Sequence, residues 1–330
     1  METARREEWH RAAEAGDASA QYEYGFELFY GAGDEAGGLR WLKESARQQF
    51  PAALLELVFI HLDESGSGQF YAPKKGVEYL LQAVELGYAP AITRYARALE
   101  EGDGVEQDIP EALNRYIVAA EDGEGEAAYL AADMLRFGRE PYLAPQPERA
   151  MELLRKSAQL EDAQGMFEYA RCHEEGSGVG KDLGEARKWY LRAAEQEHTE
   201  ACLYAGGMLL DGIGGDADAP RAVALLETAA ADNHVEAAYY LAGCCMEGTG
   251  TARNPRRALE LMKRCADAQF FDAAEILSQW ERGNRVRVSP LSERYRKKSL
   301  WTVLGWTVLW ITVLLLIFAA VNAWEHYCAF

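Results

Sequence analysis

The sequence segment with the clearest potential for chemistry is a glycine-rich loop that contains a lysine. Residues 176–182 read Gly-Ser-Gly-Val-Gly-Lys-Asp, and loops of this kind can hold phosphate with their backbone amides. A phosphate-binding loop follows a strand, whereas residues 165–175 before this loop have a helical pattern. Comparable glycines recur at 102–104 and 248–250, so we interpret all of these glycines as structural turns.

The other reactive side chains are dispersed. His198 and His234 follow equivalent small residue pairs, which favours helix capping over metal binding. The six cysteines form no Cys-x-x-Cys pair and favour reduced thiols in small core positions, with a disulfide framework as the alternative. The hydrolase and metalloprotease signatures are absent. We therefore predict a protein that is not an enzyme and needs no cofactor and no metal.

An internal repeat must position all of these side chains. A small residue opens a helical stretch every 33 to 38 residues, at Ala20, Ala53, Ala91, Ala127, Gly165, Ala201, Ala237 and Ala273. A glycine turn and a pair of small residues, such as Ala119-Ala120, keep the same period. Three markers with one period predict stacked helical hairpins.

Each marker has a physical role in such a hairpin. Small residues allow two helices to cross closely, and the glycines accept the positive φ that ends a helix. Asp108, Asp182 and Asn254 precede the second helices as capping residues. Aromatic or aliphatic residues three or four positions before each small pair lie on the same buried stripe.

The pattern in residues 165–198, GMFEYARCHEEGSGVGKDLGEARKWYLRAAEQEH, resembles the Sel-one-like repeat (SLR) family, which is related to the tetratricopeptide repeats. The resemblance covers about residues 9–282. It implies an all-α fold, in which residues 1–283 form a right-handed superhelical solenoid of about seven repeats with half-repeat caps. It also implies an adaptor that binds protein partners. The second repeat, before Gly66, and the fourth, at 141–148, depart from the pattern, so we expect their loops to differ.

In related repeats the first helix of each pair lines the concave face. One row of residues on that face would read Tyr22, Leu55, Thr93, Tyr129, Phe167, Leu203 and Tyr239. The next would read Phe26, Phe59, Arg97, Asp133, Arg171, Gly207 and Gly243, with the two glycines widening the groove. Aromatic and arginine side chains dominate binding hot spots. We therefore predict partner contacts at Tyr22, Phe26, Arg97, Tyr129, Arg136, Phe167, Arg171 and Tyr239. The alternative is that part of the first row packs between helices as ordinary core.

The charge distribution argues against a nucleic-acid partner. The chain has a formal charge of −19, and six cations against two anions follow Gly283, so the repeats themselves are even more acidic. Phosphate binding requires clustered Lys and Arg. The basic stretch lies within residues 284–299, directly before a hydrophobic tail, a position that instead predicts membrane topology.

The tail at 300–324 contains 25 residues without a charge, enough to cross a bilayer with some tilt. Trp301 and Trp324 stand near its ends as interfacial anchors. The alternative is a buried helix that caps the solenoid. The flanking cations Arg294, Arg296, Lys297 and Lys298 predict a single-pass, tail-anchored protein whose repeats face the cytosol, leaving residues 325–330 outside. The linker 284–299 either only sets topology or also binds anionic headgroups.

These observations support two functional hypotheses. The first is a membrane-tethered adaptor or scaffold that binds a segment of an unidentified protein partner in the groove. The second is a regulator or immunity-type protein that neutralises an enzyme or toxin at the membrane. A hydrolase is a third class, but the hydrolases described in this repeat family carry cysteine pairs in every repeat, and this chain does not.

Overall fold

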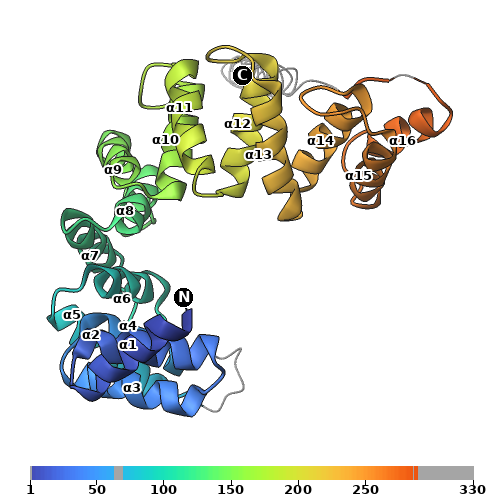
Figure 1. The fold of residues 1–330 in the computed structure, drawn as a ribbon. Helices are drawn as coiled ribbons and strands as arrows, with labels where there is room; N and C mark the ends of the chain where they lie inside the picture. Colours follow the sequence, from blue (N-terminus) through green and yellow to red (C-terminus); the bar gives the residue numbers. More distant parts are fainter. Residues whose placement is uncertain (1, 63–69, 285, 289–330) are drawn as a thin grey trace, which may run out of the picture. The chain divides into compact units, whose positions relative to one another are not determined.

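The computed structural model describes residues 2–62, 70–284 and 286–288 (Figure 1). Within these ranges the chain forms sixteen α-helices and one π-helical turn, and its single β-bridge joins Arg139 to Leu143. The predicted all-α repeat fold is therefore confirmed. The chain divides into two compact units, Met1–Gly180 and Lys181–Phe330.

In each repeat, the helix whose first turn contains the opening small residue is called the first helix. The first unit has the first helices α2 (Ala18–Phe26), α4 (Pro51–Leu62), α6 (Ala89–Glu101), α8 (Gly125–Phe137) and α10 (Ala163–Glu175). Its second helices are α1 (Glu2–Glu14), α3 (Glu35–Arg47), α5 (Pro73–Glu85), α7 (Ile109–Glu121) and α9 (Pro147–Gln159). A π-helical turn, η1 (Glu27–Gly31), extends α2.

The second unit continues the same alternation. Its first helices are α12 (Thr199–Asp211), α14 (Val235–Glu247) and α16 (Ala273–Glu281). Its second helices are α11 (Leu183–Ala194), α13 (Ala219–Ala231) and α15 (Pro255–Asp267).

The helices begin at the predicted capping residues. Asp108 accepts a hydrogen bond from the amide of Glu111 at 3.0 Å, and Asn254 accepts one from Arg257 at 3.1 Å. His198 and His234 do the same for α12 and α14 through Nδ1, which confirms their predicted capping role. These bonds satisfy amides that have no partner inside a helix.

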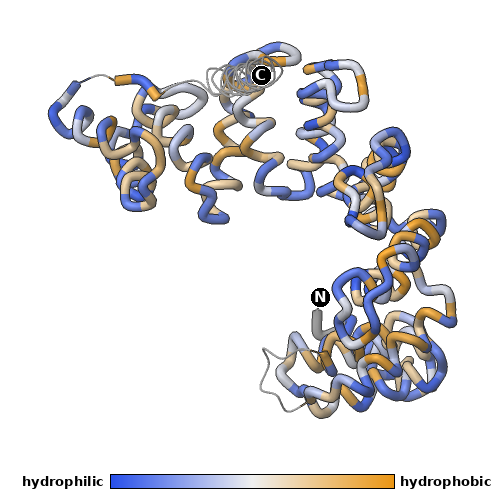
Figure 2. The backbone as a smooth tube through the Cα atoms, turned by 180° about the vertical axis from the view of Figure 1, so that it is seen from behind, coloured by the Kyte–Doolittle hydropathy of each residue, from blue (hydrophilic) through white to orange (hydrophobic). Residues whose placement is uncertain are grey.

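Small residues form the helix crossings, as the repeat markers predict. All eight opening residues are buried, and every small pair contributes at least one buried residue. The crossing of α2 and α3 is close, because a Cβ on Gly38 would lie 2.6 Å from the carbonyl oxygen of Gly25. Figure 2 shows apolar and polar stretches alternating along the helices. In the first unit the buried apolar side chains form two clusters, one from Leu39 to Ala91 and one from Ile92 to Ala150.

The first helices of neighbouring repeats also touch each other directly, α6 with α8 and α8 with α10. Their surface turned away from the second helices is called the first-helix face below. It carries the row that runs from Phe26 through Phe59, Arg97 and Asp133 to Arg171.

The loop of the fourth repeat differs from its neighbours, as its sequence predicts. After Gly138 the chain makes a tight hairpin in which Arg139 and Leu143 exchange backbone hydrogen bonds of 2.8 and 2.9 Å. This hairpin directs the Arg139 side chain back toward the helices of the third and fourth repeats.

Among the described residues, no helix has both the length and the apolar character that crossing a membrane requires. The predicted spanning segment 300–324 lies outside the described residues, together with its flanks Arg294, Arg296, Lys297, Lys298, Trp301 and Trp324.

Candidate protein-binding surface

An aromatic patch marks the N-terminal end of the first-helix face. It consists of Phe26, Tyr30 and Phe59, which are 40%, 53% and 48% exposed. Phe59 lies on α4 three residues after Glu56, the residue that the Tyr30 hydroxyl contacts. The rings of Phe26 and Tyr30 lie 4.8 Å apart, and half-buried Tyr22 supports Phe26 from below at 6.1 Å. Isolated exposed apolar side chains are common, whereas neighbouring exposed aromatic rings are typical of interaction sites.

The π-helical turn places Tyr30 in this patch. Its extra residue per turn is closed by the bond from the Ala32 amide to the Glu27 carbonyl, at 2.9 Å. Such turns occur frequently at functional sites. The Tyr30 hydroxyl donates to the Glu56 carboxylate on α4 at 2.6 Å, which joins the first two repeats. Burial raises the pKa of Glu56 above its ordinary value.

Ion pairs continue the face through the next repeats. Arg97 on α6 pairs with Glu126 at the start of α8 at 2.6 Å, with both side chains partly exposed. Arg171, the other arginine of the row, is also paired within the molecule, with the Glu168 carboxylate. A partner would meet fixed, balanced charges there, which favours specificity over simple attraction.

Arg139 connects the third and fourth repeats. Its guanidinium contacts Glu100 of α6 at 2.9 Å and Asp133 of α8 at 3.0 Å. The Tyr116 hydroxyl also donates to Glu100, at 3.2 Å. Arg139 was missed by the sequence analysis, although the unusual loop of the fourth repeat is the signal that could have found it.

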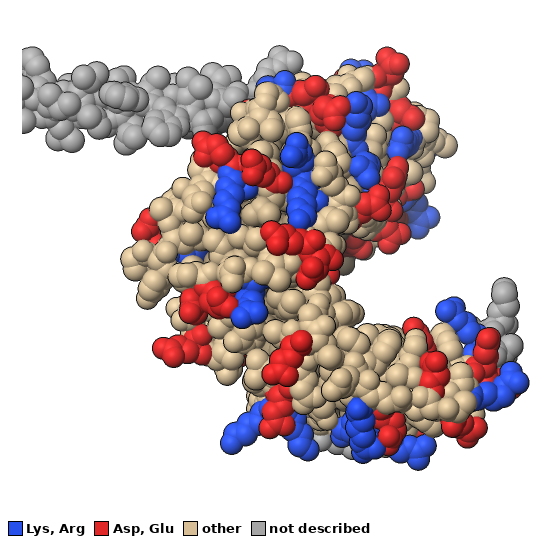
Figure 3. All heavy atoms as spheres, turned by 90° about the vertical axis from the view of Figure 1, so that its left-hand side faces the viewer, with Lys and Arg blue, Asp and Glu red and all other residues tan. Residues whose placement is uncertain are grey.

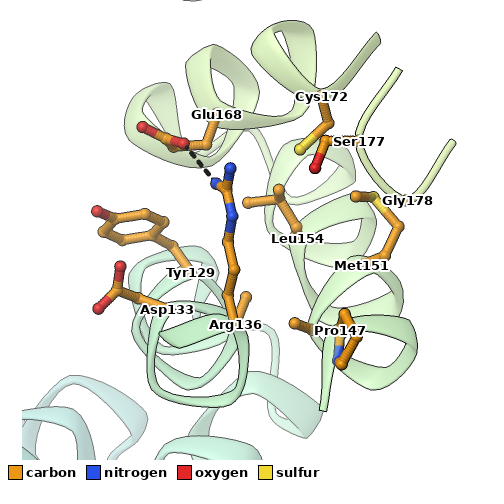
Figure 4. A pocket seen from close by; sticks show the side chains of 12 residues that line it. Tyr129, Asp133, Arg136, Pro147, Met151, Leu154, Glu168, Cys172, Ser177 and Gly178 are labelled. Atoms are coloured by element: carbon orange, nitrogen blue, oxygen red, sulfur yellow. Dashed lines mark hydrogen bonds and ion pairs between the residues drawn. The ribbon is translucent and has the colours of Figure 1, made fainter. Parts of the chain in front are cut away.

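Glu168 connects the fourth and fifth repeats. Its buried carboxylate accepts from Arg136 of α8 at 3.0 Å (Figure 4). It also contacts Arg171 of its own helix at 2.7 Å. Two guanidinium groups thus share one carboxylate, and the Nε atom of Arg171 has no hydrogen-bond partner. The carboxylate fixes the orientation of both predicted binding arginines.

A small cavity of about 50 Å³ adjoins this ion pair. Tyr129, Asp133 and Arg136 form one wall, and Met151 and Leu154 of α9 form another, as Figure 4 shows. Sites for small molecules usually enclose roughly 300–1,000 Å³, so this cavity has room for a few waters or part of a side chain.

The first predicted row is more deeply buried than the second. Phe167 is 6% exposed and Tyr239 is 4% exposed, and Tyr22 and Tyr129 are half-buried. This row stands next to the helix crossings, so its side chains fill the space between helices. The Tyr239 hydroxyl donates to Asp272 at the start of α16, at 2.6 Å. Phe167 and Tyr239 therefore offer little surface to a partner.

The second predicted row is accessible to solvent mainly at its N-terminal end. Phe26 and Phe59 are exposed, Arg97 and Arg171 are partly exposed, and Gly207 and Gly243 are buried. Partner binding by the eight predicted residues stays a prediction, and the structure adds Tyr30 and Phe59 to the accessible set.

Acidic and basic side chains are interspersed on the face of the molecule that Figure 3 shows. The basic stretch that follows Gly283 extends beyond the described residues. On the face shown, the repeats present no concentrated positive surface of the kind that binds a phosphate backbone.

The described cysteines are packing residues. All five are free and buried, which agrees with their predicted core positions, and Cys328 lies outside the described residues. Burial raises the pKa of Cys202 to about 11 and that of Cys244 to about 12, so these thiols remain protonated and weakly nucleophilic. No group of His, Cys, Asp and Glu side chains in the described part of the chain has a metal-binding arrangement.

Comparison with curated proteins finds fungal relatives. The chitin synthase regulator SKT5 of Malassezia restricta is 33% identical over 170 residues, which are 50% of this chain and 12% of the relative. SKT5 of Saccharomyces cerevisiae is 27% identical over 201 residues, 58% of this chain and 29% of the relative. The chain thus spans less than a third of the length of these relatives.

Two solved structures share the fold. The protective antigen c5321 of uropathogenic Escherichia coli, which displays an SLR fold, aligns with a TM-score of 0.65 and 23% identity over 83% of this chain and 58% of that chain. A Sel1 repeat protein from Oxalobacter formigenes aligns with a TM-score of 0.56 and 23% identity, over 74% of this chain and 96% of that chain.

The family model matches unit by unit. The Sel1 repeat model matches residues 18–50, 64–88, 89–124, 125–162, 163–198, 199–234 and 235–270. These seven matches agree with the helical hairpins described above, and the resemblance predicted from the sequence is confirmed. The chain belongs to the Sel1 repeat family.

Proposed function

We propose that this protein is a membrane-tethered adaptor, and that the first-helix face of its first unit binds an apolar segment of a partner protein. The observation that carries this proposal is the exposed aromatic patch of Phe26, Tyr30 and Phe59. Phe26 and Phe59 of the patch lie on the same row as Arg97 and Arg171, whose guanidinium groups are held in ion pairs.

The patch has the chemistry of an anchor site. Covering a half-exposed aromatic ring contributes on the order of 1 kcal/mol. The adjacent rings of Phe26 and Tyr30, with Phe59 on the next first helix, can together anchor a short helix or extended segment. The Tyr30 hydroxyl is already bound to Glu56, so a partner covers the rings without leaving that hydroxyl unpaired. The fixed ion pairs further along the row then select the register of the bound segment.

The membrane part of the proposal rests on the sequence. Residues 300–324 carry no charge, and Arg294, Arg296, Lys297 and Lys298 precede them. The positive-inside rule orients the repeats toward the cytosol, at a bacterial inner membrane or a eukaryotic tail-anchored site. A tether raises the local concentration of the binding face, so a partner held by modest contacts stays at the bilayer.

A second candidate is the regulation of one membrane-bound enzyme, including neutralisation of an enzyme or toxin. The curated relatives favour it, because they are named chitin synthase regulators. The same face would then bind a single enzyme tightly. A change in that enzyme's activity on binding distinguishes a regulator from a scaffold that holds several weak partners.

The test compares two double variants of the full-length protein in its own membranes. In Phe26→Ser/Phe59→Ser the aromatic patch is removed. In the control, Leu81→Ser/Leu86→Ser, two similarly exposed leucines at the second helix α5 are removed instead. Chemical crosslinking followed by mass spectrometry measures which proteins contact residues of the first-helix face.

We expect the aromatic double variant to lose the crosslinks of the first unit, and the leucine variant to keep them at the wild-type level. Equal crosslinks in both variants would refute the binding face. The tether is tested separately by ending the chain at residue 299, which should move the protein from the membrane fraction to the soluble fraction.

A further inference from the structure

The second unit holds a stretch of its own chain against α14. After α16 the chain reverses at Gly283, whose φ is +81°, and the backbone carbonyl of Val286 accepts a hydrogen bond from the buried Trp280 indole at 2.7 Å. Figure 1 shows this red stretch turning back from α16. Residues 286–288, called the return segment below, thereby reach the preceding repeat.

Val288 lies in a notch that the repeat leaves open. Gly243 of α14 occupies the row position that is Phe26, Phe59, Arg97, Asp133 and Arg171 in the first five repeats. A Cβ built on Gly243 would lie 3.0 Å from both Cβ and Cγ2 of Val288. The valine side chain thus fills the space that a side chain at position 243 would need.

A charge contact fixes the register. The Arg287 guanidinium lies 3.4 Å from the carboxylate of Glu247, one helical turn after Gly243 on α14. Because this ion pair is exposed, it adds little binding energy and mainly determines which residue of the segment lies beside Glu247. The Trp280 indole thus contacts Val286, Glu247 contacts Arg287, and the space beside Gly243 accommodates Val288.

We propose that the first-helix face of α14 is a binding site for an extended segment with a cation followed by a β-branched residue, and that the chain's own return segment occupies it. The glycine at position 243 is then a recognition feature, since it admits a Cβ-branched side chain against the helix. A partner segment with the same pattern has to displace residues 286–288. This site lies outside the aromatic patch of the first unit, so neither proposal depends on the other.

The first test measures whether the return segment is seated in the full-length protein. Trypsin cleaves after Arg287 only when the return segment leaves α14. The rate at which the product ending at Arg287 forms, measured by mass spectrometry, therefore reports the fraction of molecules whose return segment is detached. Val288→Asp removes the side chain that fills the notch, and Gly243→Leu fills the notch from the helix. Ala274→Leu, which adds the same bulk at an exposed position of α16, is the control.

Each rate is divided by that of a capped 284–290 peptide of the same sequence, because an acidic residue after Arg287 slows trypsin by itself. We expect this relative cleavage to be about tenfold faster in Val288→Asp and Gly243→Leu than in wild type, the factor that a contact of this size supports. Ala274→Leu should match wild type. Unchanged rates in Val288→Asp, which alters no residue of the helices, would overturn the proposal even if Gly243→Leu disturbed folding.

The second test asks whether the vacated site binds the segment when it is added separately. The probe is a capped peptide of residues 284–290, Asn-Arg-Val-Arg-Val-Ser-Pro, observed by saturation-transfer NMR because a short segment released from its tether binds at millimolar affinity. We expect severalfold stronger transfer to the valine methyls with full-length Val288→Asp than with wild type. Adding Gly243→Leu to that variant should abolish the gain. Equal transfer in all three proteins would contradict a specific site.

Discussion

The guanidinium of Arg136 on α8 and the carboxylate of Glu168 on α10 meet at 3.0 Å across the boundary between two repeats. Arg171 contacts the same carboxylate at 2.7 Å. One buried acidic side chain therefore determines how two arginines of the first-helix face are presented. Arg97 and Glu126 form the corresponding pair one repeat earlier, but in a more exposed place.

Replacing Glu168 by Ala should destabilise the first unit strongly, because both guanidinium groups lose their counter-charge. We expect a loss of about 2 kcal/mol in the free energy of unfolding, below the value for a fully buried pair because the arginines are partly exposed. Glu126→Ala is the matched control and should cost less than about 1 kcal/mol. Urea unfolding measures both variants, and equal losses would contradict this assignment.

The half-buried Glu56 should make stability depend on pH. Burial raises its folded-state pKa above the ordinary value of 4.5, so the folded protein binds the proton more tightly than the unfolded chain. This contribution is fully present below pH 4.5 and is lost as the pH rises through the folded-state pKa. Glu56→Gln, which keeps an acceptor for Tyr30, should therefore raise the melting temperature at pH 7.

The advantage of Glu56→Gln should shrink on acidification and disappear below pH 4.5, because wild-type Glu56 is then also neutral. Thermal unfolding followed by circular dichroism at several pH values measures the difference. A pH-independent advantage would show that desolvation of the carboxylate is not its cause.

The turns between repeats contain strained residues that glycine should relieve. Glu197 has a φ of +58°, whereas the equivalent residue in three first-unit turns is a glycine, Gly16, Gly87 or Gly123. Glu197→Gly should stabilise the protein by about 0.5 to 1 kcal/mol, the left-handed penalty less the added freedom of the unfolded chain. Glu195→Gly, two residues earlier at a helical φ of −63°, should be neutral or destabilising in the same assay.

A hydrogen bond of 2.6 Å joins Tyr239 of α14 to Asp272, the residue directly before α16. Tyr239→Phe removes the donor to Asp272 and should cost about 1 kcal/mol. It should also increase hydrogen exchange in α16. The neighbouring Tyr240→Phe keeps that bond and is the control. Similar hydrogen exchange of α16 in both variants would contradict the prediction that the Tyr239–Asp272 bond stabilises this helix.

The repeat pattern was sufficient to predict the helices, because small residues and caps act locally. Ala91 and Ala127 are buried and Asp182 caps α11 as predicted. Side-chain exposure was less predictable. Phe167 stands two residues after a crossing residue, and whether it faces a groove or the neighbouring helix depends on how the adjacent repeat packs.

Two features could not be read from the average repeat at all. Arg139 joins the site only because an atypical hairpin turns it back toward Glu100, and Tyr30 joins the patch only because α2 ends in a π-helical turn. Both depend on single departures from the repeat. The glycine at position 243 did predict a wider groove, and Val288 now lies in that space.

The hairpin of the fourth repeat has a mechanical consequence. In a stack of repeats each repeat touches only its neighbours, so the contacts at each boundary set its resistance to force. Here Arg139 fastens α6 to α8, and Arg136 fastens α8 to α10. Ion pairs therefore reinforce two successive boundaries in the second half of the first unit, and a pulling force applied to the ends of this unit should separate α1 to α4 before α6 to α10.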